Sequence, residues 1–193
     1  MEKIKSIIQA SIDVKQHLLN DAPLLLMVQE VVIVIVSAFK NGNRVYFCGN
    51  GGSAADAQHL AAELSGRFYL NREALPADAL HCNSSYLTAV ANDYSYDQVY
   101  ARLIEGITNK GDVLLGFSTS GSSLNIIKAF EAAKQKGVTT IGFTGSSGGI
   151  MKPVSDYLFK MPSTDTPRIQ ESHITIGHII CQLVEEQYFG SRA

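Results

Sequence analysis

The residues best suited to catalysis or metal binding lie in two separate segments of the chain. His59 and Glu63 are four residues apart, which places them about 40° apart on one face of a helix. Gln170 and His178 are eight residues apart, about 80° around a helix, whereas Glu171 differs from His178 by only about 20°. Imidazole and carboxylate groups move protons in many enzymes, and together with amide oxygens they bind divalent metals. Helical phase therefore favours Glu171 over Gln170 as the partner of His178, and spacing does not say whether the two segments meet.

Two runs of small polar residues support a functional role for His59 and Glu63. The runs at 48–53 (Cys-Gly-Asn-Gly-Gly-Ser) and 118–123 (Ser-Thr-Ser-Gly-Ser-Ser) each follow an apolar stretch and precede a helical pattern. Glycines can simply permit tight turns, but two such loops at helix N-termini predict one small anionic ligand, most simply a phosphorylated one. Neither run has the signature of a Walker loop or of a dinucleotide site. Since His59 and Glu63 follow the first run closely, a site is favoured over a solvated surface pair.

The elements that must position these residues alternate between strand and helix patterns from residue 44 onward. Predicted strands cover residues 44–48, 77–82, 112–117, 138–143 and 156–161. Predicted helices cover residues 1–20, 22–40, 53–66, 84–91, 97–109, 122–136 and 167–189, with a short one near 149–154. This alternation predicts an α/β fold with a parallel, doubly wound sheet between two helical layers. Ligands of such sheets bind beyond the carboxyl ends of the strands, where both small-residue runs lie.

Composition narrows the class of protein. The 193 residues are 46% hydrophobic and 18% charged, as in one soluble α/β domain. A formal net charge of −2 argues against nucleic acid or an anionic membrane surface as the main partner. The N-terminal residues lack the apolar core of a signal peptide. Cys48, Cys82 and Cys181 are far apart and form no paired motif, so we expect three buried thiols in a reducing cytoplasm.

Residues 24–39 form a long apolar run. Its six consecutive β-branched residues favour a strand, but Asp21 and Pro23 at its start and Asn41 after it predict a helix. The run is interrupted by polar residues and is shorter than the ~20 residues of a spanning helix. A helix that is apolar on most sides must be buried on most sides. We therefore expect this helix to be buried against another subunit; the alternatives are an internal strand or a helix buried in the core of its own domain.

Several further motifs occur in order across nearly the whole chain. They are Cys48-Gly-Asn-Gly-Gly-Ser53, Asp56-Ala57, His59-x3-Glu63-Leu64-x-Gly66-Arg67, Asn92-Asp93, Gly111-Asp-Val-Leu-Leu-Gly116, Ser118-Thr-Ser-Gly121, Thr144-Gly145, Gly148-Gly149, and Arg168-Ile-Gln-Glu171 with His178. Each motif is weak alone, but their joint order and spacing are specific. In these motifs the chain resembles the phosphoheptose isomerase (sedoheptulose 7-phosphate isomerase) family, within the sugar-isomerase (SIS) fold. The segment between Arg67 and Asn92 is less similar.

The resemblance implies a fold, an assembly and a reaction. The fold is a three-layer, flavodoxin-like SIS domain with a five-stranded parallel sheet, spanning residues 1–193. Residues 1–42 would be N-terminal helices for oligomer contact, and residues 43–193 the α/β core. The implied protein is a cytoplasmic homotetramer with active sites between subunits. It would convert D-sedoheptulose 7-phosphate to D-glycero-D-manno-heptose 7-phosphate through an enediol, on the route to ADP-heptose and lipopolysaccharide.

The resemblance also implies roles for individual residues. Substrate contacts would fall on Asn50, Gly51, Gly52, Ser53, Glu63, Asn92, Asp93, Ser118, Thr119, Ser120, Ser123 and Gln170. One Zn²⁺ per subunit would be bound by His59, Glu63, Gln170 and His178, so the resemblance selects Gln170 where helical phase selects Glu171. Glu63 would act as the base and His178 as the acid or proton shuttle. These roles compete at Glu63, because a carboxylate that binds a metal is a weaker base.

Two other functional classes compete with the enzyme. A relative in the same fold binds a replication initiator without catalysing a reaction, and that branch lacks the glutamate and the final histidine. Glu63 and His178 therefore favour the isomerase. A sugar-phosphate sensor in a regulator would carry a helix-turn-helix or a basic face, and the sequence shows neither.

Overall fold

A computed structural model describes residues 1–190, so the predicted domain limit at residue 193 lies outside the described residues. The strands are β1 (Val45–Gly49), β2 (Ala77–Ala79), β3 (Val113–Phe117), β4 (Thr139–Thr144) and β5 (Tyr157–Lys160). The helices are α1 (Glu2–Asn20), α2 (Ala22–Lys40), α3 (Gly52–Ser65), α4 (Ser84–Asp93), α5 (Val99–Ile107), α6 (Leu124–Gln135) and α7 (Thr166–Phe189). Two 3₁₀ segments, η1 (Tyr96–Gln98) and η2 (Gly149–Val154), complete the order. The predicted elements are all present within this part of the chain, with β2 shorter than expected.

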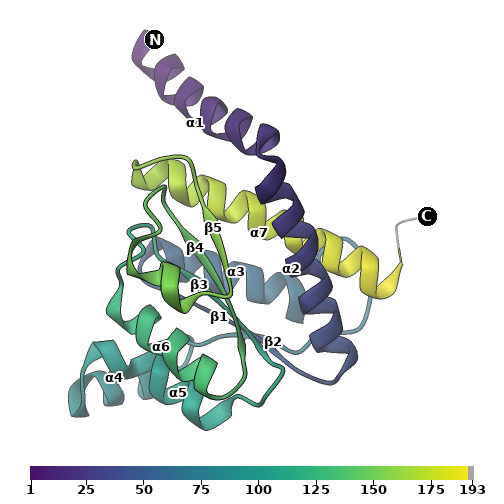
Figure 1. The fold of residues 1–193 in the computed structure, drawn as a ribbon, viewed down its shortest axis with the longest axis vertical. Coiled ribbons are helices and arrows are strands. Elements are labelled where there is room, and N and C mark those ends of the chain that lie inside the picture. The colour runs from purple at the N-terminus through teal and green to yellow at the C-terminus, as the bar shows by residue number, and fades with distance from the viewer. Residues whose placement is uncertain (191–193) are drawn as a thin grey trace.

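The five strands form one parallel sheet in the order β2-β1-β3-β4-β5. The order reverses between β1 and β3, so the loops that follow these two strands flank the crevice where doubly wound folds bind ligands. Both runs of small polar residues lie in these loops. Figure 1 shows the sheet running through the middle of the molecule with helices on both sides. The predicted α/β, three-layer architecture is confirmed.

Alternating side chains of the sheet build two separate cores, one on each face. Phe47 and Leu115 point to the face covered by α2, α3 and α7. Tyr46 and Leu114 point to the opposite face, which α5 and α6 cover. The central strands β1 and β3 are buried on both faces, which explains why they appear in the sequence as continuous apolar runs rather than alternating ones. The two cores fix α3 and α7 on the same side of the sheet.

The cysteine prediction is correct for two residues and wrong for the third. Cys48 and Cys181 are buried free thiols, and burial raises the pKa of each, so both stay protonated. Cys82 is exposed. The reason is that edge strand β2 ends at Ala79, three residues before Cys82, instead of continuing to residue 82.

His173 is a core residue of α7. It is fully buried, and its ring lies against the rings of Phe117 and Phe143. Its Nε2 lies 3.3 Å from the Thr144 carbonyl oxygen. Burial lowers the pKa of the His173 imidazole to about 4, and the Thr144 carbonyl only partly opposes this shift. The neutral ring is therefore part of the folded core.

We expect His173 to make the folded state sensitive to acid. In the unfolded chain the imidazole titrates near 6.5 and in the folded state near 4, so its contribution to stability is complete above pH 6.5 and is lost as the pH falls toward 4. Between about pH 8 and about pH 5 the free energy of unfolding should fall by about 2 kcal/mol from this residue. Urea unfolding at fixed protein concentration measures it. For His173→Phe, the fall in the free energy of unfolding over this interval should be smaller than in the wild type by that amount. An equal fall in both proteins would contradict a pKa of about 4 for His173 in the folded state.

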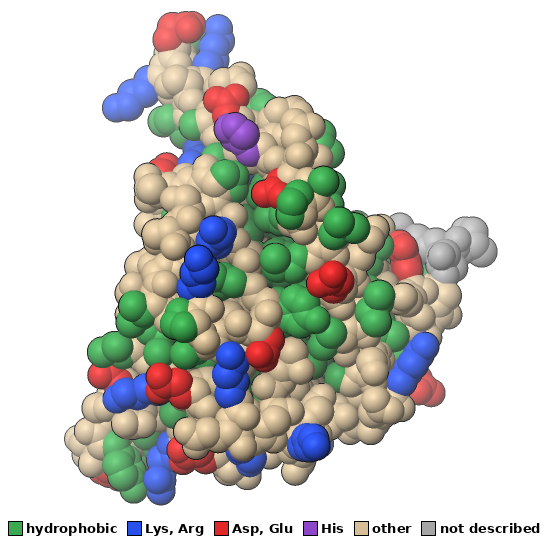
Figure 2. All heavy atoms as spheres, in the orientation of Figure 1, with side chains coloured by type: hydrophobic (Ala, Val, Ile, Leu, Met, Phe, Trp, Pro, Cys, Tyr) green, Lys and Arg blue, Asp and Glu red, His purple; other side chains and the backbone are tan. Residues whose placement is uncertain are grey.

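The N-terminal helices leave much apolar surface uncovered. α2 buries one face but exposes Leu26 and Ile33, at 59% and 57%. α1 buries only Val14 and Leu18 and projects away from the sheet (Figure 1). Figure 2 shows hydrophobic side chains gathered over α2. α2 is long and apolar enough to cross a membrane by length and composition, but 44% of its most apolar window is buried inside the structure.

Candidate active site

Helices α3 and α7 run side by side in the same direction, which brings the two chemically promising segments together. Gly52 lies against Gln170, and Leu60 lies against Gly177, so paired positions rise together along both helices. A Cβ at Gly177 would overlap the Leu60 side chain. The close approach of α3 and α7 therefore depends on position 177 being glycine, which has no side chain. This packing was not predictable from helical periodicity.

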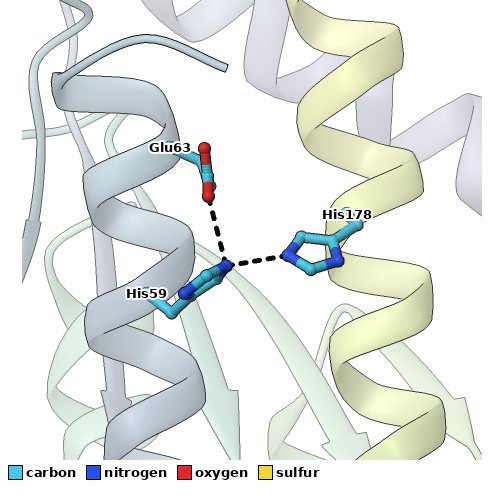
Figure 3. A group of neighbouring side chains, drawn as sticks. All are labelled: His59, Glu63 and His178. Atoms are coloured by element: carbon cyan, nitrogen blue, oxygen red, sulfur yellow. Dashed lines mark hydrogen bonds and ion pairs between the residues drawn. The ribbon is translucent and has the colours of Figure 1, made fainter. Parts of the chain in front are cut away.

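His59, Glu63 and His178 converge between these two helices, as Figure 3 shows. The His59 Nε2 atom lies 2.9 Å from His178 Nε2 and 3.1 Å from Glu63 Oε1. One nitrogen or oxygen of each side chain lies within 4.8 Å of the other two. His59 and Glu63 are 51% and 22% exposed, so the group is open to solvent and to a ligand.

The spacing of these three side chains fits a divalent metal such as zinc. Two imidazole nitrogens and one carboxylate oxygen are ligand types that Zn²⁺ favours. In a tetrahedral site with bonds of about 2.0–2.1 Å, ligand atoms lie about 3.3 Å apart. The two short separations at His59, 2.9 and 3.1 Å, are close to that value. The three side chains could therefore hold one metal ion.

His178 has an environment that favours the neutral form of its ring. Burial lowers the pKa of its imidazole, and the neighbouring His59 lowers it further, against the opposing effect of Glu63. The Phe68 ring stacks on it, with centroids 5.7 Å apart and an angle of 26° between the planes. A neutral imidazole is the form that binds a metal or accepts a proton.

Gln170 and Glu171 lie apart from the three converging side chains. A Cβ at Gly52 would lie 2.7 Å from Gln170 Nε2, so the Gln170 amide lies against the start of α3. Eight residues of helix separate it from His178, about 12 Å of axial rise. Glu171 accepts hydrogen bonds from Ser11 and Arg168, each at 2.6 Å. The residue that helical phase favoured is therefore occupied by contacts that join α7 to α1.

The loop after β1 is held by a network of amide and phenol groups. The Asn50 and Asn125 side chains donate to each other, at 3.0 and 2.8 Å, and Tyr96 donates to Asn50 at 3.1 Å. The buried Tyr100 hydroxyl donates to the Gly49 carbonyl at 2.6 Å. These bonds leave Gly51 and Gly52 at the beginning of α3, where backbone N–H groups suit an anion, while the Ser53 N–H donates to the Asn50 carbonyl at 3.0 Å.

The loop after β3 presents hydroxyl groups at the start of α6. Ser118 is 3% exposed, and its Oγ lies 2.8 Å from Ser123 Oγ and 3.5 Å from Ser120 Oγ. Ser120 is exposed, and Thr119 and Ser120 line a surface hollow with residues of the next two loops. The hydroxyls therefore cluster at one helix N-terminus.

Replacing Ser120 or Ser123 by Ala should mainly weaken substrate binding. Each change removes a hydroxyl donor from the expected phosphate position while leaving Glu63 and His178 in place. We expect KM for the sugar phosphate that the resemblance implies to rise, with kcat little changed, in steady-state assays. If KM were unchanged in both variants, the phosphate would have to lie on the loop after β1 instead.

Asn92 and Asp93 lie at the C-terminal end of α4. The Asn92 amide donates to Asp93 at 3.0 Å on the exposed surface. Tyr96, three residues after Asp93 in the chain, donates to Asn50 in the loop after β1. Their predicted contact with substrate stays a prediction.

Sequence analysis missed several residues that shape the site. Asn125 carries a detectable signal, because it is an amide in the first turn of a helix that follows a small-residue loop. Arg72 and Glu185 carry none, because they are 113 residues apart and belong to no local pattern. Phe68 lies where the resemblance to known sequences weakens.

Comparison with known proteins points to one family. A family profile, the SIS domain, matches residues 24–145. The chain is 50% identical over 189 residues to the phosphoheptose isomerase of Aneurinibacillus thermoaerophilus, a match that covers 98% of this chain and 96% of that protein. The structure of a phosphoheptose isomerase from Francisella tularensis superposes with a TM-score of 0.91 at 34% identity, over 96% of this chain and 97% of that one. The Neisseria gonorrhoeae phosphoheptose isomerase gives a TM-score of 0.90 at 36% identity, over 96% and 98%.

Proposed function

Since the chain belongs to the phosphoheptose isomerase family of SIS-domain proteins, we propose that it converts D-sedoheptulose 7-phosphate to D-glycero-D-manno-heptose 7-phosphate. The protein is an isomerase by its family. The observation that carries the proposal is the convergence of His59, Glu63 and His178 between the helix after the β1 loop and the last helix. Such a group can move protons on a sugar whose phosphate is held by the strand-end loops.

The reaction requires two proton transfers at neighbouring carbons. A proton leaves C1 of the ketose and one is returned to C2, while O2 gains a proton and O1 loses one, through an enediol. Glu63 is the group proposed to take the proton from C1 and return it to C2. His178, with its neutral ring, can accept a hydroxyl proton at one oxygen and release it at the other.

We also propose that His59, Glu63 and His178 bind one Zn²⁺ per subunit. The fit of the ligand types and of their separations supports this. When bound, the ion would polarise the sugar carbonyl as a Lewis acid. We propose Gln170 as a substrate contact. The resemblance implies that it is also the fourth ligand, but within this chain its amide lies against the start of α3, about 12 Å along α7 from His178.

The proposal includes an assembly and a cellular setting. The uncovered apolar faces of α1 and α2 support a homotetramer in which residues 1–42 form the subunit contacts, and residues 43–193 the core of a single domain. We propose that the active site lies between subunits. We expect a cytoplasmic enzyme that supplies a heptose phosphate to ADP-heptose and lipopolysaccharide synthesis.

The direct test is incubation of the purified protein with sedoheptulose 7-phosphate, with and without added Zn²⁺. An aldose heptose 7-phosphate should appear, detectable by NMR or by an aldose-specific reagent. Binding without turnover under both conditions would contradict the enzyme and favour a sugar-phosphate sensor. Failure to bind the sugar phosphate would favour a protein-binding role for the fold.

A further inference from the structure

A buried ion pair lies directly behind the site, between the segment that follows α3 and helix α7. The Arg72 and Glu185 side chains are 4% and 1% exposed, and Arg72 Nε donates to Glu185 Oε1 at 2.9 Å. A buried pair of charges adds little net stability, because desolvation offsets the attraction. Its remaining hydrogen-bonding groups must also be satisfied by neighbours. The partners of each side chain therefore show what the pair holds in place.

The Arg72 guanidinium caps the C-terminal end of α3. Nη2 donates to the Glu63 carbonyl at 2.8 Å, and Nη1 lies 2.7 Å from the Leu64 carbonyl and 3.1 Å from that of Gly66. The last carbonyls of a helix have no partners within it, and a cation there interacts favourably with the helix dipole. The turn that carries Glu63 is therefore fixed by Arg72 through its backbone.

The Glu185 carboxylate holds the chain that leaves α3. It accepts hydrogen bonds from three successive backbone N–H groups, those of Phe68, Tyr69 and Leu70, at 3.2, 2.8 and 2.9 Å. Burial raises the pKa of this carboxyl, but these donors and Arg72 together lower it by more, so the net pKa lies below its ordinary value. An ionised Glu185 thus fixes the position of Phe68.

Arg72 and Glu185 contact different parts of the active site. Arg72 acts on the Glu63 backbone, and Glu185 acts on Phe68, whose ring stacks on the His178 imidazole. Glu185 also follows His178 by seven residues, about 20° around α7, so both lie on the face that meets α3. One ion pair therefore constrains both sides of the gap that separates Glu63 from His178.

We propose that Arg72 and Glu185 are positioning residues that set the separation and orientation of Glu63 and His178; the catalytic role of these two side chains rests on the proposed function. The ion pair contacts neither side chain directly. It fixes the last turn of α3 against α7 and holds Phe68 over the His178 ring. Loss of the pair should change the geometry of the reacting groups more than the loops that hold the phosphate.

The test uses Glu185→Gln and Phe68→Leu in the full-length protein, with Glu186→Gln as a matched control. The first substitution keeps the side-chain volume but leaves an amide that cannot accept every donor around it. The second removes the stacked ring while leaving the ion pair intact. We expect both variants to lower kcat on the order of 10- to 100-fold with KM for sedoheptulose 7-phosphate nearly unchanged. Phe68→Tyr, which retains the ring, should keep a wild-type kcat, as should Glu186→Gln, one residue along α7.

A second measurement does not depend on turnover. Competition with a chromophoric chelator gives the Zn²⁺ affinity of each folded protein, and we expect both variants to bind more weakly because Glu63 and His178 are less well oriented. Circular dichroism shows whether each variant is folded, and Phe68→Leu keeps the test valid if Glu185→Gln does not fold. Folded variants with wild-type kcat and Zn²⁺ affinity, or with a raised KM alone, would overturn the proposal. A wild-type protein without isomerase activity would contradict the proposed function, while the Zn²⁺ affinities would still decide the positioning role.

Discussion

Replacing Glu63 by Gln is expected to lower kcat for isomerisation by roughly two to four orders of magnitude while leaving the fold intact. The amide keeps the shape of the side chain but cannot take a proton from carbon. Glu63 is 22% exposed and makes its short side-chain contact with His59, so the substitution leaves no buried partner unsatisfied. His178→Gln should have an effect of the same size, since it removes the neutral imidazole. Rates measured with sedoheptulose 7-phosphate, together with circular dichroism, check both variants.

The control for this experiment is Glu171→Gln. Glu171 lies on the same helix as His178 and is nearer to it in phase, but it is bonded to Ser11 and Arg168. We expect this variant to retain nearly wild-type turnover. A folded Glu63→Gln or His178→Gln protein with a wild-type kcat would remove that residue from acid–base catalysis.

Breaking the N-terminal contact surface is expected to abolish both assembly and activity. Wild-type protein should scatter light as a tetramer, at four times the 20.9 kDa mass of one chain. Leu26 and Ile33 on α2 remain exposed, and burying each side chain is worth roughly 1.5–3 kcal/mol. Ile33→Glu would place a charge in that surface and should yield a smaller, inactive species. Exposed apolar surface of this extent is unusual in a monomer.

A matched substitution separates the interface from a general effect of charge. Ile107, at the end of α5, is 41% exposed and lies on the opposite side of the sheet from α2. Ile107→Glu should leave both mass and activity unchanged. A stable, active wild-type monomer at micromolar concentration would contradict the interface and the shared active site together.

The fold was predictable because each element carries its own periodicity. Apolar runs bounded by Gly and polar residues indicated the strands, and caps such as Asp21, which accepts a hydrogen bond from the Leu24 N–H, indicated the helix starts. The contact between α3 and α7 was not predictable in this way. It depends on Gly177 meeting Leu60, two residues with no relation along the sequence.

In the candidate site too, local pairs of residues were predictable and contacts between distant residues were not. His59 and Glu63 form a local pair, so spacing could propose them, whereas His178 joins them only through helix packing. Phase favoured Glu171, because an angle around one helix carries no information about competing partners on α1. Arg72 and Glu185 were not predicted, since they are distant in the sequence and their other contacts are mostly with backbone groups that a sequence does not distinguish.

The paired amides of Asn50 and Asn125 also bear on the chemical durability of the protein. The asparagine of an Asn-Gly sequence deamidates readily, because the unhindered glycine nitrogen attacks the preceding side-chain amide and expels ammonia. Asn50 precedes Gly51, but its amide is held by Asn125 and Tyr96. Attack by the Gly51 nitrogen requires the side chain to leave these bonds first. We therefore expect the network that shapes the loop also to slow spontaneous deamidation at Asn50.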